Sequence, residues 1–348
     1  MAEPITVAII NYNGADYLEE TVQSILDSDY PDLRLMLVDD VSTDDSVTRV
    51  RHRFPKVRIV QMEENVRFRG RYPLANRVRN RALREADTRL VFLADNDIVM
   101  DRNCLREMAD AMDALPDCAV CTPRILTREN PDRIYSDGTE LHYACATISR
   151  HRGASASEVP ETPKPSLGCG IQLLDREKAL EIGGMNEDYV VGWGDDGEFH
   201  QRMNMSGYRV FNIPSARVYH PSKTEGFRAV PQVKNRLYFI WHMYAWRTLL
   251  LAAPALWLYD LMLFFFLVLK GGLKEYVISV VDFWRHFGII MVQRRRIQKR
   301  RTVADRSLMT CGPIYVAEHL MDHPVLGLGM RMINGAFRGY WVIIKRWI

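Results

Sequence analysis

The chain has 348 residues, 47% of them apolar, and its formal net charge is only +3. This length suits about two domains with a sizeable core, and the small net charge argues against a general nucleic-acid binder. The six cysteines are scattered, and no second pair accompanies Cys118 and Cys121 at the spacing of a zinc finger. We therefore expect reduced thiols in a cytosolic environment.

The N-terminal segment lacks the basic and apolar regions of a secretory signal, and it predicts a strand that begins almost at once. Up to about residue 125, short apolar runs alternate with segments of helical spacing. We expect strands over 5–10, 33–38, 57–62 and 90–94, and helices over 17–26 and 72–86. Such alternation is typical of a mostly parallel sheet covered on both faces. Ligands of such sheets bind outside the carboxyl ends of the strands.

Polar clusters follow three of the expected strands, at equivalent positions: Asn11-Tyr12-Asn13, Asp39-Asp40 with Ser42 and Asp44, and Asp95-Asn96-Asp97. Carboxylates at the second cluster can accept hydrogen bonds from a ribose or a base, while Ser42 or Asp44 can instead cap the next helix. Carboxylates at the third suit Mg²⁺ or Mn²⁺. A solvated turn is the alternative there, but the preceding buried strand favours a binding site.

Residues 126–165 are rich in Pro, Ser, Arg and Asp, and we expect loops there, with a flexible stretch over 153–165. A helix over 195–206 begins with Asp195-Asp196, so one carboxylate can hold structure while the other takes a proton. Capping of the helix dipole is the alternative. His220 follows a strand over 208–213 and is either a third metal ligand or an ordinary hydrogen-bonding residue.

Two further features have competing interpretations. Trp193 can stack on a sugar ring or belong to the core. The arginines between Arg67 and Arg89 form a solvated face, from which one or two can pair with phosphate.

Nine segments, taken in order, resemble the inverting family 2 glycosyltransferases with the GT-A fold, in a rhamnosyltransferase-like, non-processive form. These segments are 7–14, 38–44, Asn76, 79–80, 92–97, 182–186, 193–202, 207–209 and 218–220. The resemblance implies a nucleotide-diphosphate sugar donor and a Mn²⁺ or Mg²⁺ ion. It implies that Asp196 is the catalytic base and that Asp97 and His220 are metal ligands. It further implies that the donor is bound by Asn11, Asn13, Asp39, Asp40, Arg79, Asp95, Asn96, Trp193 and Asp195.

The sequence departs from the family pattern at three places. Asp195 stands where the family usually has Glu, which leaves its role open. Arg67, Arg69 and Arg71 stand where relatives often have small residues, so donor contacts there are open too. The Gln-x-x-Arg-Trp signature of processive relatives is absent, which favours a single addition per encounter.

The composition changes near Pro231, and we expect a catalytic domain over 1–230 and a helical region over 231–348. Residues 249–269 reach membrane-spanning length but contain Pro254 and Asp260. The segment 276–292 is too charged to span, and the basic run 294–301 follows it. We expect an interfacial or re-entrant helix pair on the cytoplasmic face of the inner membrane. A buried bundle or a homodimer interface is the alternative.

A membrane location suggests a lipid-linked saccharide acceptor, as in cell-surface polysaccharide or glycolipid synthesis. Two rival functions remain. A sugar nucleotidyltransferase or phosphotransferase normally needs a Gly-rich N-terminal loop, which residues 11–14 do not provide. A non-catalytic membrane scaffold would retain the fold without needing the acidic residues and His220.

Overall fold

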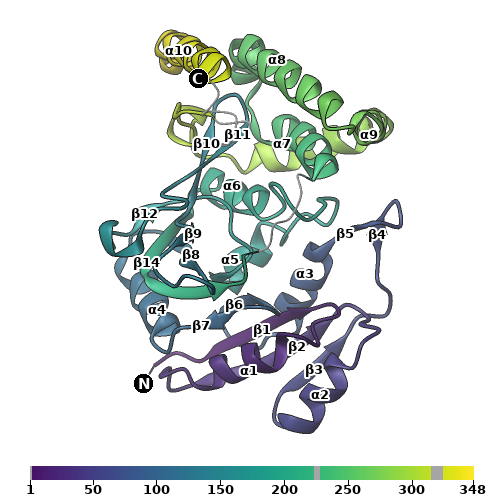
Figure 1. The fold of residues 1–348 in the computed structure, drawn as a ribbon, viewed down its shortest axis with the longest axis vertical. Coiled ribbons are helices and arrows are strands. Elements are labelled where there is room, and N and C mark those ends of the chain that lie inside the picture. The colour runs from purple at the N-terminus through teal and green to yellow at the C-terminus, as the bar shows by residue number, and fades with distance from the viewer. Residues whose placement is uncertain (1, 223–227, 315–323) are drawn as a thin grey trace.

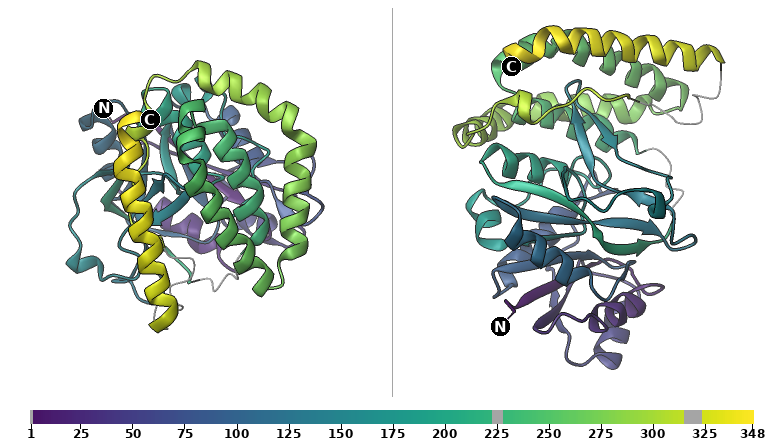
Figure 2. Two further views of the ribbon diagram at one scale, coloured as in Figure 1. Left: turned by 90° about the horizontal axis from the view of Figure 1, so that it is seen from above. Right: turned by 90° about the vertical axis from the view of Figure 1, so that its left-hand side faces the viewer.

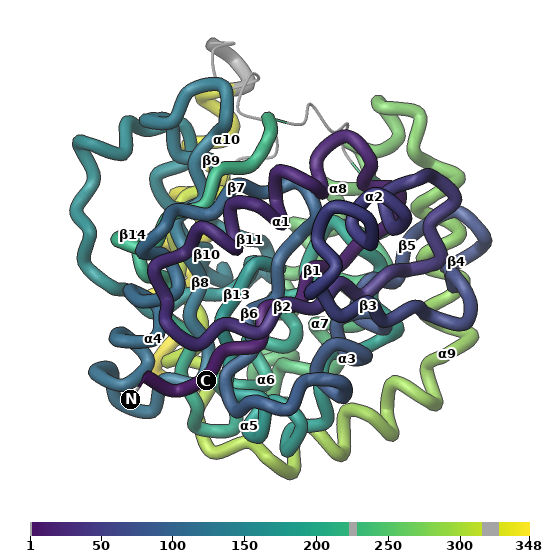
Figure 3. Tube along the Cα trace, turned by 90° about the horizontal axis from the view of Figure 1, so that it is seen from below, coloured from purple at the N-terminus to yellow at the C-terminus, as the bar shows by residue number. Residues whose placement is uncertain are grey.

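The N-terminal half of the sheet is parallel. The computed structural model describes residues 2–222, 228–314 and 324–348. Four strands lie in the order β3-β2-β1-β6: β1 (Ile5–Asn11), β2 (Leu33–Asp39), β3 (Arg58–Gln61) and β6 (Leu90–Asp95). Three helices connect them: α1 (Leu18–Leu26), α2 (Ser46–Arg53) and α3 (Ala75–Glu85). Strand β1 lies between β2 and β6, and sheets of this kind bind ligands outside the carboxyl ends of their strands. Figure 3 shows these N-terminal elements from below.

The second half of the sheet is mixed rather than mostly parallel, because β13 (Gln172–Asp175) runs antiparallel to both β6 and β8 (Cys118–Thr127). Beyond β8 lie β14 (Arg209–His220), parallel to it, and the antiparallel edge strand β12 (Lys164–Pro165). The remaining elements of this half are β7 (Val99–Met100), β9 (Ile134–Ser136), α4 (Cys104–Ala114), α5 (Arg176–Glu181) and α6 (Gly197–Met205). Strand β14 extends well past the expected residues 208–213, and His220 is its last residue.

Both faces of β1 are buried, as the continuous apolar runs predict. Alternate residues point to opposite faces of a strand. Val7 and Ile9 pack with Val22 of α1 in one apolar cluster, whereas Ala8 packs with Leu83 of α3 in another. The two helical layers therefore fix the register of β1, and with it the position of the polar residues at its end.

Residues 126–165 contain more strand than their composition indicates. Besides β9, they form the hairpin β10 (Thr139–His142) and β11 (Ala146–Ser149) and the short helix η1 (Ala156–Glu158). The expectation of loops was wrong for this hairpin, whose tight turn places Cys145 at φ 56°. The hairpin reaches the C-terminal helices (Figure 1), where the Tyr143 hydroxyl donates to the Phe337 carbonyl at 2.9 Å. A smaller hairpin joins β4 (Arg67–Phe68) to β5 (Tyr72–Pro73).

The C-terminal helices form a layer at the end of the molecule opposite the N-terminus (Figure 2). They are η2 (Pro231–Asn235), α7 (Arg236–Met243), α8 (Trp246–Leu269), α9 (Leu273–Lys299), η3 (Asp305–Ser307), α10 (Pro324–Ile344) and η5 (Lys345–Trp347). Of the helices in the described ranges, α8 alone is long and apolar enough to cross a membrane. Helix α10 had no counterpart among the expected elements.

Charged residues within these apolar helices form contacts inside the protein. Asp260 of α8 pairs with the buried Arg236 of α7, and Asp282 of α9 accepts from the Tyr238 hydroxyl at 3.0 Å. Arg294, the first residue of the basic run, is also buried and donates to the Tyr244 carbonyl at 2.7 Å. The expectation that the whole basic run meets lipid was therefore wrong for Arg294, since its guanidinium joins two helices.

Candidate active site

Asn11 connects the three polar strand ends through hydrogen bonds. Its buried amide donates to Asp39 at 2.8 Å and accepts from Asn96 at 2.8 Å, so it bridges the ends of β2 and β6 across β1. Asp39 is fully buried and also accepts from the Ser42 backbone N–H at 2.9 Å. A Cβ at Gly14 would lie 2.4 Å from atoms of both Asn11 and Asn96, which explains the glycine. These bonds fix the cluster before any ligand arrives.

A cavity of about 420 Å³ opens at these strand ends, and we call it the strand-end cavity. Its polar and aromatic lining includes Asn11, Tyr12, Asp40, Arg67, Arg79, Asp95, Asn96, Asp97, Tyr135, His220 and Arg228. At one end, the Arg67 guanidinium lies over the Tyr12 ring, 4.4 Å from its centre. Burial raises the pKa of the neighbouring Asp40 to about 6, although Arg67 opposes the rise. This end offers an aromatic face beside a hydrogen-bonding carboxyl group.

The opposite end of the strand-end cavity is a candidate metal centre. Ligand atoms of Asp95, Asp97 and His220 all lie within 4.8 Å of one another. The chain brings them together because β7, which directly follows the Asp97 turn, pairs with the end of β14 that carries His220. The register aligns Tyr219 with Val99.

Hydrogen bonding at His220 indicates which ring nitrogen can bind a cation. Its Nδ1 lies 2.8 Å from the Pro221 carbonyl, which can only accept, so Nδ1 carries the proton. In the neutral ring Nε2 then has a lone pair, and it lies 3.4 Å from a carboxylate oxygen of Asp97. Two acceptors that face each other at this distance fit a divalent cation between them. The ring also stacks on Tyr135, with 5.4 Å between centres.

Arg79 anchors the loop that precedes α6. It donates to Asp195 at 3.0 Å and to Asn76 at 3.0 Å, and it lies 4.0 Å from Asp95. Asp195 is buried and also accepts from the Gly192 backbone N–H at 3.1 Å. The charge of Asp195 is thus neutralised within the protein, which gives this residue a positioning role between the two halves of the sheet.

Asp196 lies differently from its neighbour. It precedes α6 and accepts from the Gly197 N–H at 2.7 Å, and it lines a second cavity of about 180 Å³, the Asp196 cavity. Burial, and after it the charge of Asp195, raise the pKa of Asp196 to about 6, against the opposing effect of Arg79. Trp193 and Phe239 form apolar walls of this cavity, and their rings meet edge to face. Gly192 lines both cavities, so the two meet at that residue.

The structure separates the expected site residues into three groups. Those that line the strand-end cavity are Asn11, Asp40, Arg79, Asp95, Asn96, Asp97 and His220, and those that line the Asp196 cavity are Trp193 and Asp196. Asn13, Asp39 and Asp195 line neither and instead organise the surrounding loops; the Asn13 side chain accepts from the Thr43 N–H at 2.8 Å. Sequence reasoning missed Tyr135 and Arg228. Tyr135 lies in the segment expected to be loop, and no motif marks Arg228.

Comparisons with known proteins identify the family of the chain. The family profile described as glycosyl transferase family 2 matches residues 6–179, half of the chain. A second, described as the N-terminal domain of galactosyltransferase, matches residues 150–224. A similar protein is the putative teichuronic acid biosynthesis glycosyltransferase TuaG of Bacillus subtilis (strain 168). It is 32% identical over 181 residues, which are 51% of this chain and 64% of that relative, less than two thirds of its length.

The solved structure of GalNAc-T7 shows a similar fold. GalNAc-T7 with UDP, GalNAc and Mn²⁺ superposes with a TM-score of 0.56 at 15% identity, over 73% of this chain and 51% of that one. Mannosyltransferase PcManGT from Pyrobaculum calidifontis, in complex with GDP-Man and Mn²⁺, has a TM-score of 0.48 at 18% identity, over 100% and 88%. The matched residues 6–179 include the parallel half of the sheet and all three polar strand ends, and the chain belongs to glycosyl transferase family 2.

Proposed function

We propose that this chain transfers one sugar from a nucleotide-diphosphate sugar to an acceptor hydroxyl and inverts the anomeric centre. The proposal rests on one observation: candidate metal ligands and a candidate base lie in two separate cavities that meet at Gly192. Facing acceptors suited to a cation lie in the strand-end cavity, and a carboxylate of raised pKa lies in the Asp196 cavity. In-line displacement needs this arrangement, because the acceptor must attack from the face opposite the departing diphosphate.

The strand-end cavity would hold the donor. Tyr12 and Asp40 would bind the nucleoside, and Arg79 would position Asp95 toward the ribose or sugar. Asp97 and His220 would hold Mn²⁺ or Mg²⁺, and such an ion, when bound, neutralises charge on the leaving diphosphate. GalNAc-T7, which shares the fold, was solved with UDP and Mn²⁺, which supports this assignment.

Asp196 would be the base. A carboxylate with a pKa near 6 accepts a proton more readily than an ordinary aspartate, while it is still mostly ionised at pH 7. The acceptor hydroxyl would approach through the Asp196 cavity, where Trp193 offers an aromatic face of the kind that packs against sugar rings. Gly168 leaves room beside the carboxylate, because a Cβ there would lie 3.8 Å from the Asp196 oxygen and 2.9 Å from the Thr139 hydroxyl.

The decisive experiment compares Asp196→Asn with wild-type protein in two assays. We expect the variant to lose transfer and Mn²⁺-dependent donor hydrolysis by at least ~10²-fold but to bind nucleotide diphosphate as wild type does. An equal loss of binding and transfer would contradict the role of Asp196. If wild-type protein hydrolyses no UDP-, GDP- or dTDP-sugar with Mn²⁺, the rival hypothesis of a non-catalytic scaffold gains support.

We further propose that residues 231–348 bind a membrane surface and that the acceptor is lipid-linked. Large exposed apolar side chains are concentrated in the C-terminal helices: 17 of the 22 among the described residues lie between Trp246 and Trp347. Trp257 and Trp284 are 68% and 62% exposed. Because Asp260 pairs with Arg236 of α7, α8 packs along the protein, which favours an in-plane helix over a spanning one.

Because we expect the sugar nucleotide to come from the cytosol, we propose that this surface binds the cytoplasmic face of the membrane. Its test is co-sedimentation with vesicles that contain anionic lipid. Trp257→Ser with Trp284→Ser should reduce binding severalfold, and substitution of the exposed Tyr17, far from the C-terminal helices, should not. Release of the wild-type protein from membranes by high salt alone would contradict an inserted apolar surface.

A further inference from the structure

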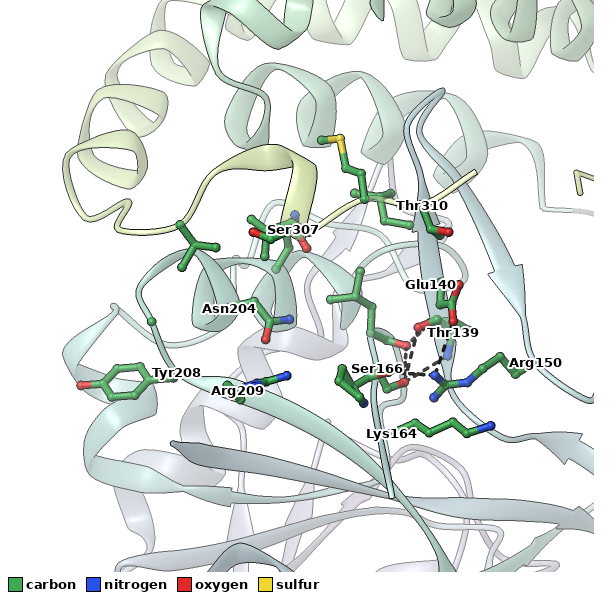
Figure 4. Close-up of a pocket in the computed structure, with 18 residues that line it drawn as sticks. Thr139, Glu140, Arg150, Lys164, Ser166, Asn204, Tyr208, Arg209, Ser307 and Thr310 are labelled. Carbon is green, nitrogen blue, oxygen red and sulfur yellow. Dashed lines mark hydrogen bonds and ion pairs between the residues drawn. The ribbon is translucent and has the colours of Figure 1, made fainter. Parts of the chain in front are cut away.

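A third cavity is larger than either of the two discussed above. It encloses about 690 Å³, within the ~300–1,000 Å³ typical of ligand sites, and lies between strands β10 and β12, helix α6, and the segment 303–310 that follows α9. Figure 4 shows Lys164 and Arg209 on the strand side of this cavity and Ser307 and Thr310 on the opposite side. We call it the basic cavity.

Charge in the basic cavity is predominantly positive. Arg150, Lys164 and Arg209 line it, and Glu140 is the one acidic residue of the lining that the structure describes. Glu140 lies 3.6 Å from Arg150. Two cations therefore exceed what the lining itself can neutralise, and a ligand with negative charge would complement them.

Polar groups without partners also face this region. Gln201 is fully buried and lines the basic cavity, and within the described residues neither atom of its amide has a hydrogen-bond partner. The Nη2 atom of Arg150 is likewise buried and unpartnered among these residues, although its other nitrogens donate to the carbonyls of Asp137 and Pro165. Buried polar groups cost free energy when they stay unsatisfied, so these atoms indicate a polar ligand.

The basic cavity adjoins the Asp196 cavity. Thr139, Leu141 and Leu167 line both of them, and an antiparallel β-bridge joins Thr139 to Leu167. Helix α6 also connects the two, because Asp196 precedes its first turn and Gln201 lies in its second. Hydroxyls, amides and apolar walls in one lining are a mixture that suits a saccharide.

We infer that the basic cavity binds an anionic saccharide, namely the charged part of the acceptor beyond the sugar that reacts. The inference rests on the proposed function, since it takes the Asp196 cavity as the place where the acceptor hydroxyl enters. It adds the substrate class: a glycan that carries carboxylate or phosphate groups.

The test uses the full-length chain and isothermal titration with trigalacturonate, with maltotriose as the neutral counterpart. We expect trigalacturonate to bind more tightly than maltotriose, and its affinity to fall with salt. Lys164→Gln with Arg209→Gln should weaken trigalacturonate binding by about 3- to 10-fold and leave maltotriose unchanged. The matched control is Arg51→Gln with Lys56→Gln, which removes two exposed cations from α2 and the loop after it.

A further variant separates a ligand contact from a structural role. Gln201→Leu removes two unsatisfied polar atoms, so the fold should be as stable as wild type or more so, while trigalacturonate binding weakens. A parallel titration with glucose 6-phosphate distinguishes phosphate from carboxylate recognition, and preference for either anion over maltotriose supports the inference.

Three results would overturn it: equal affinity for charged and neutral saccharides, no binding of either anion at millimolar concentration, or equal binding by the Lys164/Arg209 and control variants. Donor hydrolysis is measured on the same samples. If a donor is hydrolysed and no anionic saccharide binds, this inference alone fails, whereas a protein that hydrolyses no donor contradicts the proposed function itself.

Discussion

Replacing Asp196 by Asn should stabilise the fold at neutral pH even though it abolishes transfer. Burial raises the pKa of Asp196 from 3.8 to about 6, so the folded protein holds this proton more tightly than the unfolded chain does. The ionised carboxylate therefore costs folding free energy above pH 6, and the cost vanishes below pH 3.8. A rise of about two pKa units, at about 1.4 kcal/mol each, sets an upper limit of ~3 kcal/mol. Because Asp196 keeps part of its surface accessible to solvent, which screens the charge, we expect about 1–2 kcal/mol.

Urea unfolding of both proteins at pH 7 and pH 4.5 measures this difference. Asn can still accept the Gly197 N–H bond that Asp196 accepts, so the substitution changes charge and little else. The gain in unfolding free energy should shrink by more than about half at pH 4.5, as the wild-type carboxyl group takes up its proton. A variant that is less stable than wild type at pH 7, or a gain that does not change with pH, would refute the reasoning.

Three further outcomes follow from the same contacts. Asp195→Asn should lower the unfolding free energy by about 3–5 kcal/mol, because it leaves the buried Arg79 without its closest charge partner. In urea titrations, adding the second substitution Arg79→Met should recover most of that loss. His220→Gln should weaken Mn²⁺ binding at least ~10-fold, as followed by electron paramagnetic resonance; unchanged affinity would remove His220 from the metal centre. For wild-type protein at saturating donor, kcat should fall about tenfold from pH 7 to pH 5, because the base works only above its pKa of about 6; a flat profile would exclude Asp196 as the base.

The sequence was sufficient to predict the parallel half of the fold and its binding edge. In that half, β1, β2 and β6 are nearly continuous apolar runs, and the polar residue at the end of each run indicates the position of the carboxyl edge. Asn11, Asp40 and Asp95 were found by this local signal, and the structure places all three at one cavity. The antiparallel strand β13 could not be found in the same way, because its partners are more than 50 residues distant in sequence and an apolar run does not reveal direction.

Tertiary contacts also decided which charged residues serve structure. Asp260 looked awkward in an apolar helix only because its partner, Arg236, lies in another helix. Tyr135 reached the strand-end cavity through the antiparallel pairing of β9 with β8, which the polar composition of this segment does not indicate. These cases share one cause. The local sequence pattern predicts which face of its own helix or strand a residue occupies, whereas the residue that it contacts depends on how the helices and strands pack together.

Adjacent carboxylates with different tasks illustrate how packing assigns function. Asp195 and Asp196 have the same side chain, and the helix expected over 195–206 predicted only that they point in different directions, whereas α6 begins after both of them. The Arg79 guanidinium lies 3.0 Å from Asp195 and neutralises it, so this residue can be buried at little cost. Asp196 shares the region but receives only a partial benefit from Arg79, and both burial and the charge of Asp195 raise its pKa. The ion pair between Arg79 and Asp195 thus holds the loop, while burial leaves the second carboxylate with a pKa of about 6, which is the property that the proposed base requires.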